Sequence, residues 1–310
     1  MSTDASQITV GLDVGYDAVR MVAIEQSPQG PLIRRIGEQP LAMTYAPTAL
    51  LDHRDDISTA IRDILTTHSE PDWPVIVGLR NRFATVMIPR VDASMPPQTT
   101  YDWLLWEAEQ FTDESISNYV VDIGWSDHTT ETGRDVFVVA ARQNSVNAMN
   151  DIIESAEITP AGMTVATIAL INAFEATHSL SEWESAAIAH IEPGAIDIIF
   201  MRDTSINLTV MPLESDQGSD DRAVESFSTQ FRHLLNVMPE EDAPDTVYVS
   251  SERKNLKELC EQWGEQLNRR VAAVAPFQAL QIDEAIEGQV KQLNEAAFMI
   301  AIGLALQPEE

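Results

Sequence analysis

The sequence lacks several features that would assign it to a secreted, membrane or disulfide-rich class. Its 310 residues include one cysteine, Cys260, which has no partner for an internal disulfide. The longest apolar stretch, residues 296–306 (AAFMIAIGLAL), is much shorter than the roughly 20 residues of a membrane-spanning helix, and it is interpreted as a buried helix. The opening residues MSTDASQ have neither the basic flank nor the apolar core of a signal peptide. A cytoplasmic globular protein without direct membrane insertion is therefore expected.

Motifs of common catalytic and metal sites are also absent. There is no GxSxG, no Walker A loop and no HExxH. None of the histidines has metal-ligand spacing or a nearby cysteine; they are His53, His68, His128, His178, His190 and His233. His190 lies inside the apolar run AAIAHI and is interpreted as a core histidine instead of a catalytic base. The sequence thus predicts no metal site and no catalytic residue.

Positive charge is scarce. The chain has 19 Lys and Arg against 49 Asp and Glu, a formal net charge of -30, and its only lysines are Lys254, Lys257 and Lys291. The acids are spread through segments such as HRDDIS, QFTDES and MPEEDAPD, which favours a solvated acidic surface over a disordered tail. Repulsion on this scale is largely screened at about 1 M salt, where the Debye length is roughly 3 Å. We expect a halophilic host with a salty cytoplasm, and we exclude nucleic acid and anionic membrane surfaces as direct partners.

Apolar runs and turn residues alternate in an α/β pattern that repeats once. Strands are expected at 9–12, 18–24 and 32–36, and again at 186–191, 196–201 and 208–211, so two similar meanders are predicted. Between and after them the spacing predicts helices over 57–65, 102–111, 146–153, 165–177 and from 223, and strands at 75–79, 83–88, 119–123, 136–141 and 246–249. Each meander contains an acid-x-Gly turn, Asp13 with Gly15 and Glu192 with Gly194.

Paired turns of this kind are typical of the actin-like nucleotide-binding fold. There the backbone N–H groups of each turn face the phosphates, the Asp orients the water shell of the metal, and Gly permits close approach. A single acid-x-Gly turn is more often a structural feature than a phosphate-binding one. Evidence from the rest of the chain is therefore needed to choose between these two interpretations.

Longer segments carry a resemblance to a known family. From GLDVGYDAVRMVAIE through DDISTAIRDIL, YDWLLWEAEQF and VFVVAARQNSVNAMNDIIESAEITPAGMTV to AAFMIAIGLAL, nearly the whole chain resembles PilM, the actin-like, FtsA-related assembly protein of type IV pili. The resemblance implies an α/β, actin-like (ribonuclease H-like) fold of two halves, with an inserted small α/β subdomain and a reduced second half. The implied divisions are 1–80 and 146–184 for subdomain 1A, 81–145 for the inserted subdomain 1C, 185–290 for subdomains 2A and 2B, and 291–310 for a C-terminal helix that returns to 1A.

The resemblance also implies a function. PilM-family proteins bind ATP between their halves and hold the short N-terminal peptide of the bitopic inner-membrane protein PilN in a groove beside the inserted subdomain. We therefore expect a cytoplasmic scaffold of type IV pilus or related secretion assembly, not an enzyme, held at the inner membrane through a PilN-like partner. The alternative is an active actin-like ATPase that couples turnover of ATP with magnesium to assembly or polymerisation. Self-association is left open.

The sequence departs from the family where the nucleotide would lie. Tyr16 and Asp17 follow Gly15 in place of small residues, and Pro193 removes an N–H donor from the second turn. A Gly-Gly pair expected after the strand at 246–249 is replaced by Ser250 and Ser251, and the segment between residues 211 and 223 is short for the family. Nucleotide binding is therefore expected to be weakened or lost, with no cofactor. The vestigial nucleotide-binding residues are Asp13, Gly15, Tyr16, Arg20, Glu192, Gly194, Ser250 and Ser251.

The helix predicted at 102–111 has two dissimilar faces. At 100° per residue, Leu104, Ala108 and Phe111 cluster on one side and should be buried. Trp103, Trp106 and Gln110 fall on nearly the opposite side and are the predicted partner-binding residues. The alternative is that this second face packs between subdomains of the same chain. Glu107 and Glu109 could neutralise basic residues of a peptide, or be merely solvated.

Overall fold

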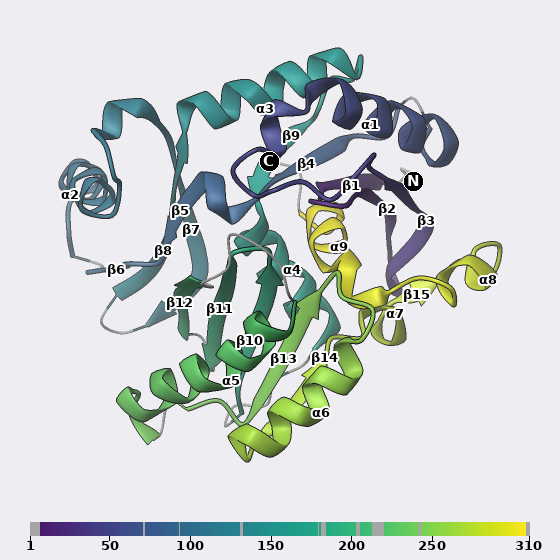
Figure 1. Cartoon of the computed structure of the whole chain (residues 1–310). Coiled ribbons are helices and arrows are strands. Elements are labelled where there is room, and N and C mark those ends of the chain that lie inside the picture. The colour runs from purple at the N-terminus through teal and green to yellow at the C-terminus, as the bar shows by residue number, and fades with distance from the viewer. Residues whose placement is uncertain are drawn as a thin grey trace.

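The computed structural model describes residues 7–70, 72–92, 94–130, 133–178, 180, 184–202, 205–212, 220–240 and 243–307, excluding the side chains of 126–130, 205, 212 and 220–226. Within these residues the strands form three sheets, and helices cover them (Figure 1). Short 3-10 helices connect some elements: η1 (Leu50–Asp52), η2 (Asn81–Phe83), η3 (Ile116–Asn118) and η5 (Glu295–Phe298). No helix of the described residues is long and apolar enough to cross a membrane.

The first sheet has the strand order β15-β3-β2-β1-β4-β9. Strands β1, β2 and β3 form an antiparallel meander, and β4 and β9 add to it in parallel. One face packs against α1 and α3, and the other packs against α4 and α9. The bounds are β1 (Ile8–Val14), β2 (Ala18–Ser27), β3 (Gly30–Pro40), β4 (Val75–Leu79), β9 (Gly162–Val165), α1 (Arg54–His68), α3 (Gln143–Ser155), α4 (Ala166–Thr177) and α9 (Met299–Ala305).

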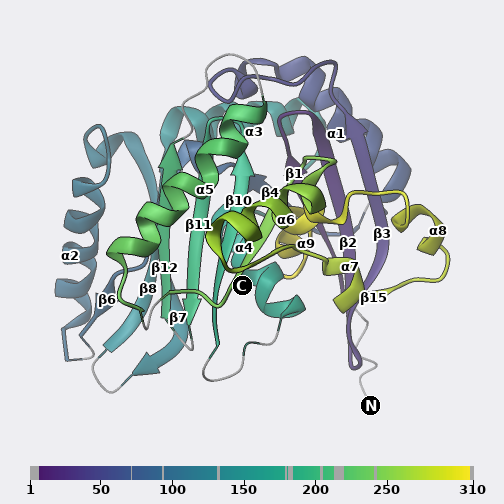
Figure 2. The same cartoon turned by 60° about the horizontal axis from the view of Figure 1, so that its bottom comes forward.

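The second sheet repeats this plan in the order β12-β11-β10-β13-β14. Again three antiparallel strands are followed by parallel ones, which confirms the predicted repeat. Helices α5 and α6 cover its outer face (Figure 2), where Phe227 of α5 packs against Trp263 of α6 with ring centroids 4.6 Å apart. The bounds are β10 (Ser185–Glu192), β11 (Ala195–Arg202), β12 (Ser205–Pro212), β13 (Thr246–Ser251), β14 (Arg270–Ala273), α5 (Asp220–Val237) and α6 (Leu256–Leu267).

A third, smaller sheet is built from residues 84–142 alone. Strand β8 (Gly133–Arg142) pairs with β5 (Ala84–Met87) and β6 (Arg90–Val91), and also with β7 (Tyr119–Thr130). Helix α2 (Pro97–Gln110) lies against one face, over a separate apolar core of Val91, Leu104, Ala108, Val136 and Val138. In the sequence this sheet lies between β4 and α3, at the position of the predicted insertion at 81–145. We call this sheet and α2 the inserted subdomain.

Helices α4 and α9 lie between the two large sheets and join their cores (Figure 1). Their contact depends on Gly303 of α9, because a Cβ atom built there would lie 1.7 Å from the carbonyl oxygen of Ala169 in α4. The predicted buried helix at 296–306 is thus confirmed as η5 followed by α9; α9 is fully buried, and η5 is buried except at Glu295.

The prediction that the second half extends to residue 290 is wrong. After α7 (Pro276–Ala279), strand β15 (Gln281–Ile282) pairs in parallel with β3 of the first sheet, and α8 (Glu287–Val290) follows it. The chain returns to the first half near residue 281 because β3 leaves an edge open there, which the short, weakly apolar segment does not reveal.

Candidate functional site

The two acid-x-Gly turns face each other between the halves. Asp13 lies near the end of β1 and Glu192 at the end of β10, and both side chains are buried. The hydroxyl of Tyr16 donates a hydrogen bond to Oε2 of Glu192 at 3.0 Å, across a separation of 176 residues. The bulky residue that follows the first turn is therefore a direct link to the second turn.

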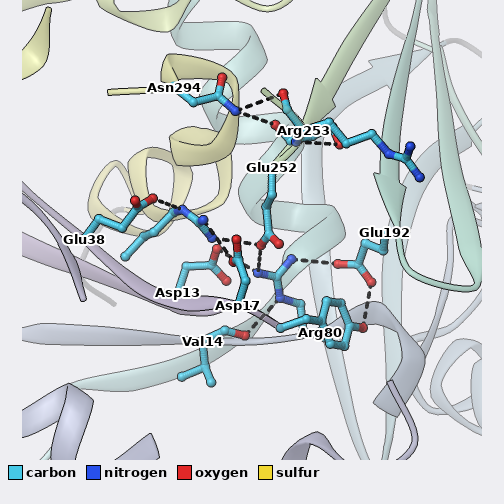
Figure 3. A network of polar contacts seen from close by, with 12 residues as sticks. Asp13, Val14, Asp17, Glu38, Arg80, Glu192, Glu252, Arg253 and Asn294 are labelled. Carbon is cyan, nitrogen blue, oxygen red and sulfur yellow. Dashed lines mark hydrogen bonds and ion pairs between the residues drawn. The ribbon is translucent and has the colours of Figure 1, made fainter. Parts of the chain in front are cut away.

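Arg80, the residue after β4, lies between these turns and is 2% exposed (Figure 3). Its Nη1 donates to Oε1 of Glu192 at 2.8 Å, and its Nη2 donates to Oδ2 of Asp13 at 3.0 Å. Its Nε donates to the carbonyl oxygen of Val14 at 3.0 Å, and Nη2 also reaches Oε1 of Glu252 at 3.1 Å. One guanidinium thus joins the end of β1 to β10 and to the segment after β13.

A second arginine, Arg20 of β2, extends this network. Its side chain is 3% exposed and donates to Glu38 at 2.7 Å, to Glu252 at 2.9 Å and to Asp17 at 3.0 Å. Glu252 accepts from both arginines with the same oxygen, so it bridges them. We call Asp13, Arg20, Arg80, Glu192 and Glu252 the interdomain ion-pair cluster.

The space directly over Gly15 is filled by this cluster. A Cβ atom built on Gly15 would lie 2.7 Å from Oε1 of Glu252 and 2.9 Å from Nη1 of Arg20. Glycine is therefore required at this turn, but what approaches its backbone is the chain's own side chains. The open approach that a phosphate would need at this turn is taken by a carboxylate and a guanidinium.

Burial raises the pKa of the carboxylates in the cluster, whereas the positive charges of the nearby arginines lower it. Burial alone would raise the pKa of Glu192, but the charge of Arg80 and the hydrogen bonds from His190 and Arg80 lower it to about 2. For Glu252, burial raises the pKa to about 7 despite the opposing charges of Arg80 and Arg20. Burial also raises the pKa of Asp13, whose Oδ1 has no hydrogen-bond partner among the described atoms. Arg80 stays protonated, since the surrounding acids outweigh its burial and raise its pKa.

The second turn is exposed at Pro193 and half-buried at Gly194, whereas the residues beside it, His190, Ser250 and Ser251, are buried. Gly194 has φ +84°, a left-handed conformation that suits glycine after Pro193. His190 is 4% exposed and contacts Oγ of Ser250 at 3.1 Å and Oε1 of Glu192 at 3.2 Å, which confirms it as a core histidine. The hydroxyl of Ser250 donates to the carbonyl oxygen of Ala296 at 2.9 Å. Ser251 is also buried, so both serines are bound within the chain.

A cavity of about 340 Å³ adjoins the cluster, between the inserted subdomain and the second sheet. Its wall includes Tyr16, Arg82 and Gly194, together with Val86 of β5 and Val210 of β12. Asn81 donates to Asp197 there at 2.6 Å, while burial and the charge of Glu192 raise the pKa of Asp197 to about 6. Among the described residues, no group of three or more His, Cys, Asp or Glu side chains could hold a metal ion.

Helix α2 of the inserted subdomain has the predicted apolar face only in part. Leu104 and Ala108 are buried, as predicted, but Phe111 is 60% exposed, so its predicted burial is wrong. The helix ends at Gln110, and Phe111 is its C-cap residue, with φ -107° and ψ 2°, so it leaves the helical face.

The predicted partner-binding residues of α2 are not equivalent. Trp103 is partly buried and packs against the core of the inserted subdomain, whereas Trp106 is 55% exposed and Gln110 is exposed. A cavity of about 420 Å³ lies beside α2 and is lined by Pro97, Tyr101, Leu104, Val121, Asp122, Ile123 and Trp125. None of Trp103, Trp106 and Gln110 lines this cavity.

Sequence reasoning did not select Arg80 or assign a role to Glu252. The signal for Arg80 is weak: it follows the apolar run VIVGL, where a charged residue usually marks a return to solvent. The one signal was the loss of phosphate-binding features at both turns: two buried acids that no longer face a nucleotide-bound metal need a cation from the protein itself.

Two related halves, each built on an antiparallel meander with a parallel strand, define an actin-like fold, here with an inserted subdomain after β4. No protein-family model and no curated protein matches the sequence. Among solved structures, the chain is similar to a PilM-PilN type IV pilus biogenesis complex, with a TM-score of 0.79 and 18% identity over 97% of this chain and 99% of that chain.

Two other solved structures have the same fold. One is a protein from Bacteroides thetaiotaomicron with an actin-like ATPase fold and unknown function, with a TM-score of 0.51 and 11% identity over 94% of this chain and 98% of that chain. The other is the cytoplasmic domain of EpsL, an inner-membrane component of the type II secretion system of Vibrio cholerae, with a TM-score of 0.51 and 9% identity over 97% of this chain and 96% of that chain. These likenesses confirm the predicted actin-like fold and its PilM-like arrangement.

Proposed function

We propose that this chain is a non-catalytic scaffold of type IV pilus or related secretion assembly, which captures the N-terminal cytoplasmic peptide of a PilN-like inner-membrane protein. The proposal is supported by the fold that the chain shares, along nearly its whole length, with the PilM-PilN complex and with the EpsL cytoplasmic domain. The scaffold would lie in the cytoplasm and be held at the inner membrane by its partner.

The single observation that carries the non-catalytic part is the position of Arg80. In a nucleotide-binding member of the fold, the phosphates and their metal lie between the two turns. Here the Arg80 guanidinium lies between Asp13 and Glu192 and pairs with both. The cluster with Asp17 and Glu38 has two arginines and five acids, so with all of them ionised its charge is already -3, which repels a triphosphate. These residues do not fit ATP with magnesium.

Exposed aromatic side chains on the inserted subdomain support the peptide-binding part. Tyr101, Trp106 and Phe111 of the α2 region and Trp125 of β7 are between 48% and 60% exposed. Large apolar side chains gathered on one small subdomain of a highly charged protein are typical of an interaction surface. Trp103, Trp106 and Gln110 remain proposed contacts of the peptide.

A binding assay tests the scaffold against the ATPase alternative. The N-terminal peptide of the PilN-like protein from the same genome should bind in about 1 M KCl with or without ATP and magnesium, a salt level that screens non-specific attraction to the acidic surface. Calorimetry with ATP and magnesium should show no binding. Asp13→Asn should leave peptide affinity unchanged, because the cluster does not contact the inserted subdomain's exposed aromatics. Low-micromolar ATP affinity, or loss of peptide binding in a folded Asp13→Asn variant, would instead favour the nucleotide-coupled alternative.

A further inference from the structure

Strand β7 has one edge that no other described strand covers. It pairs with β8 from Tyr119 to Thr130, and the strands β5 and β6 lie on the far side of β8. A long open edge presents N–H and C=O groups that can pair with another extended segment, and natural proteins usually protect such edges. Here the edge strand carries exposed apolar residues, with Val120 at 40% and Trp125 at 48% exposure.

One hydrogen bond shows which residues of β7 present their backbone outward. The N–H of Ile123 donates to Oδ1 of Asp122, a side chain of its own strand, at 2.9 Å. In an antiparallel pair, the residues alternate between those that exchange hydrogen bonds with the partner strand and those that do not. Val121, Ile123 and Trp125 therefore direct N–H and C=O toward the open edge, and the carboxylate of Asp122 covers one of these donors.

The same alternate residues also line the cavity beside α2. Val121, Ile123 and Trp125 share one face of β7 and form one wall of the 420 Å³ cavity, and Pro97, Tyr101 and Leu104 of α2 form the other. Side chains of an added strand that lie opposite Val121, Ile123 and Trp125 would point to this face. They would enter the cavity between Tyr101 of α2 and Trp125 of β7.

The charge around the open edge of β7 favours basic side chains at those positions of an added strand that do not face the cavity. The exposed carboxylate of Asp122 lies at the open edge, on the N–H of Ile123, and the chain as a whole has a net charge of -30. Basic side chains at the intervening positions would be attracted there, and acidic ones would be repelled.

We infer that the captured segment binds as an added β-strand along the open edge of β7, with apolar side chains at alternate positions in the α2–β7 cavity and basic side chains between them. This inference rests on the proposed function and specifies its binding surface. Backbone hydrogen bonds between β7 and the added strand would supply much of the binding affinity. Side-chain contacts in the cavity would supply the specificity, as in other cases of strand addition. Asp122 would release the N–H of Ile123 when the segment binds.

The test is fluorescence anisotropy with the labelled N-terminal peptide, about ten residues long to match the length of β7. Tyr101→Ala and Trp125→Ala should each weaken binding about tenfold, since each removes one wall of the cavity. Met43→Ala is the control: it deletes a large apolar side chain that is 62% exposed outside the inserted subdomain, and its affinity should equal that of the unaltered protein. Melting curves check that each variant is folded.

A second measurement uses the unaltered protein and so does not depend on variant folding. Peptides methylated at one backbone nitrogen at a time should lose affinity about tenfold at every second position, because only alternate N–H groups of an added strand face β7. Weaker binding of a Trp106→Ala variant with unchanged binding of Tyr101→Ala and Trp125→Ala, or no two-residue period in the methylation series, would overturn strand addition while leaving peptide capture intact. Absence of any binding to the unaltered protein would overturn the proposed function itself.

Discussion

Replacing Arg80 by methionine should reveal how strongly the interdomain ion-pair cluster holds the two halves together. The substitution keeps an unbranched apolar side chain but removes four hydrogen bonds, three of them to carboxylates. Asp13 and Glu192, both buried, then lose their cation. Breaking a buried pair by deleting one partner costs about 3–5 kcal/mol, because the other charge stays desolvated.

This loss corresponds to a measurable shift in melting temperature. With an unfolding entropy of roughly 2.1 cal/mol/K per residue, the 310 residues give about 0.65 kcal/mol/K, so the melting temperature should fall by roughly 5–8 °C at pH 7. Circular dichroism melts in concentrated KCl measure this directly. Arg82→Met is the matched control: Arg82 is exposed two residues further on, and its loss should change stability by less than about 0.5 kcal/mol.

The loss of folding stability caused by Arg80→Met should depend on pH. With Arg80 present, the pKa of Glu192 is about 2, so its pairing stabilises the fold above the unfolded pKa of about 4.3 and is lost as pH falls toward 2. Without Arg80, burial raises the pKa of Glu192 and the charged form destabilises the fold near neutral pH. The difference between the two proteins should therefore shrink as pH falls from 7 toward 4. A deficit below about 1 kcal/mol at pH 7, or one independent of pH, would refute this account of the cluster.

Three further outcomes are expected. Thermal stability should rise as KCl increases from about 0.1 M to above 1 M, since salt screens the net charge of -30, and a flat melting profile would contradict the halophilic interpretation. Gly303→Ala should destabilise the protein by more than about 3 kcal/mol in denaturant titrations, because its Cβ would collide with Ala169 of α4, whereas Gly288→Ala in open space should be nearly neutral. Because the pKa of Glu252 is about 7, its protonated form favours the fold, and stability should fall as pH rises from about 4.3 to 7; in a Glu252→Gln variant this slope should be reduced, and an unchanged slope would exclude Glu252 as its source.

The parts of the fold that depend on local patterns could be predicted from the sequence. Apolar runs of strand length with acid-x-Gly turns between them located both meanders, and the 3.6-residue spacing located α1 and α3. Leu104 and Ala108 were placed correctly because helical periodicity alone determines which face they occupy. Phe111 was misplaced because the helix ends one residue before it.

The parts that depend on contacts between distant segments could not be predicted. Arg80 is surrounded by residues from β1, β10 and the segment after β13, so no local pattern marks it as buried. The two residues of β15 form a strand only because the edge of β3 lies beside them. The cavity between α2 and β7 likewise depends on how the helix lies over the sheet, which periodicity does not determine.

The position of α9 also constrains the order in which the chain can fold as it is synthesised. This late segment fills the core between β1, β2 and α4, and it joins the first half across nearly the full length of the sequence. The five strands of the second sheet, in contrast, lie within residues 185–273 and can pair before α9 has left the ribosome. The first sheet is therefore completed after the second, and part of its apolar face, over β1 and β2, stays uncovered until α9 is in place.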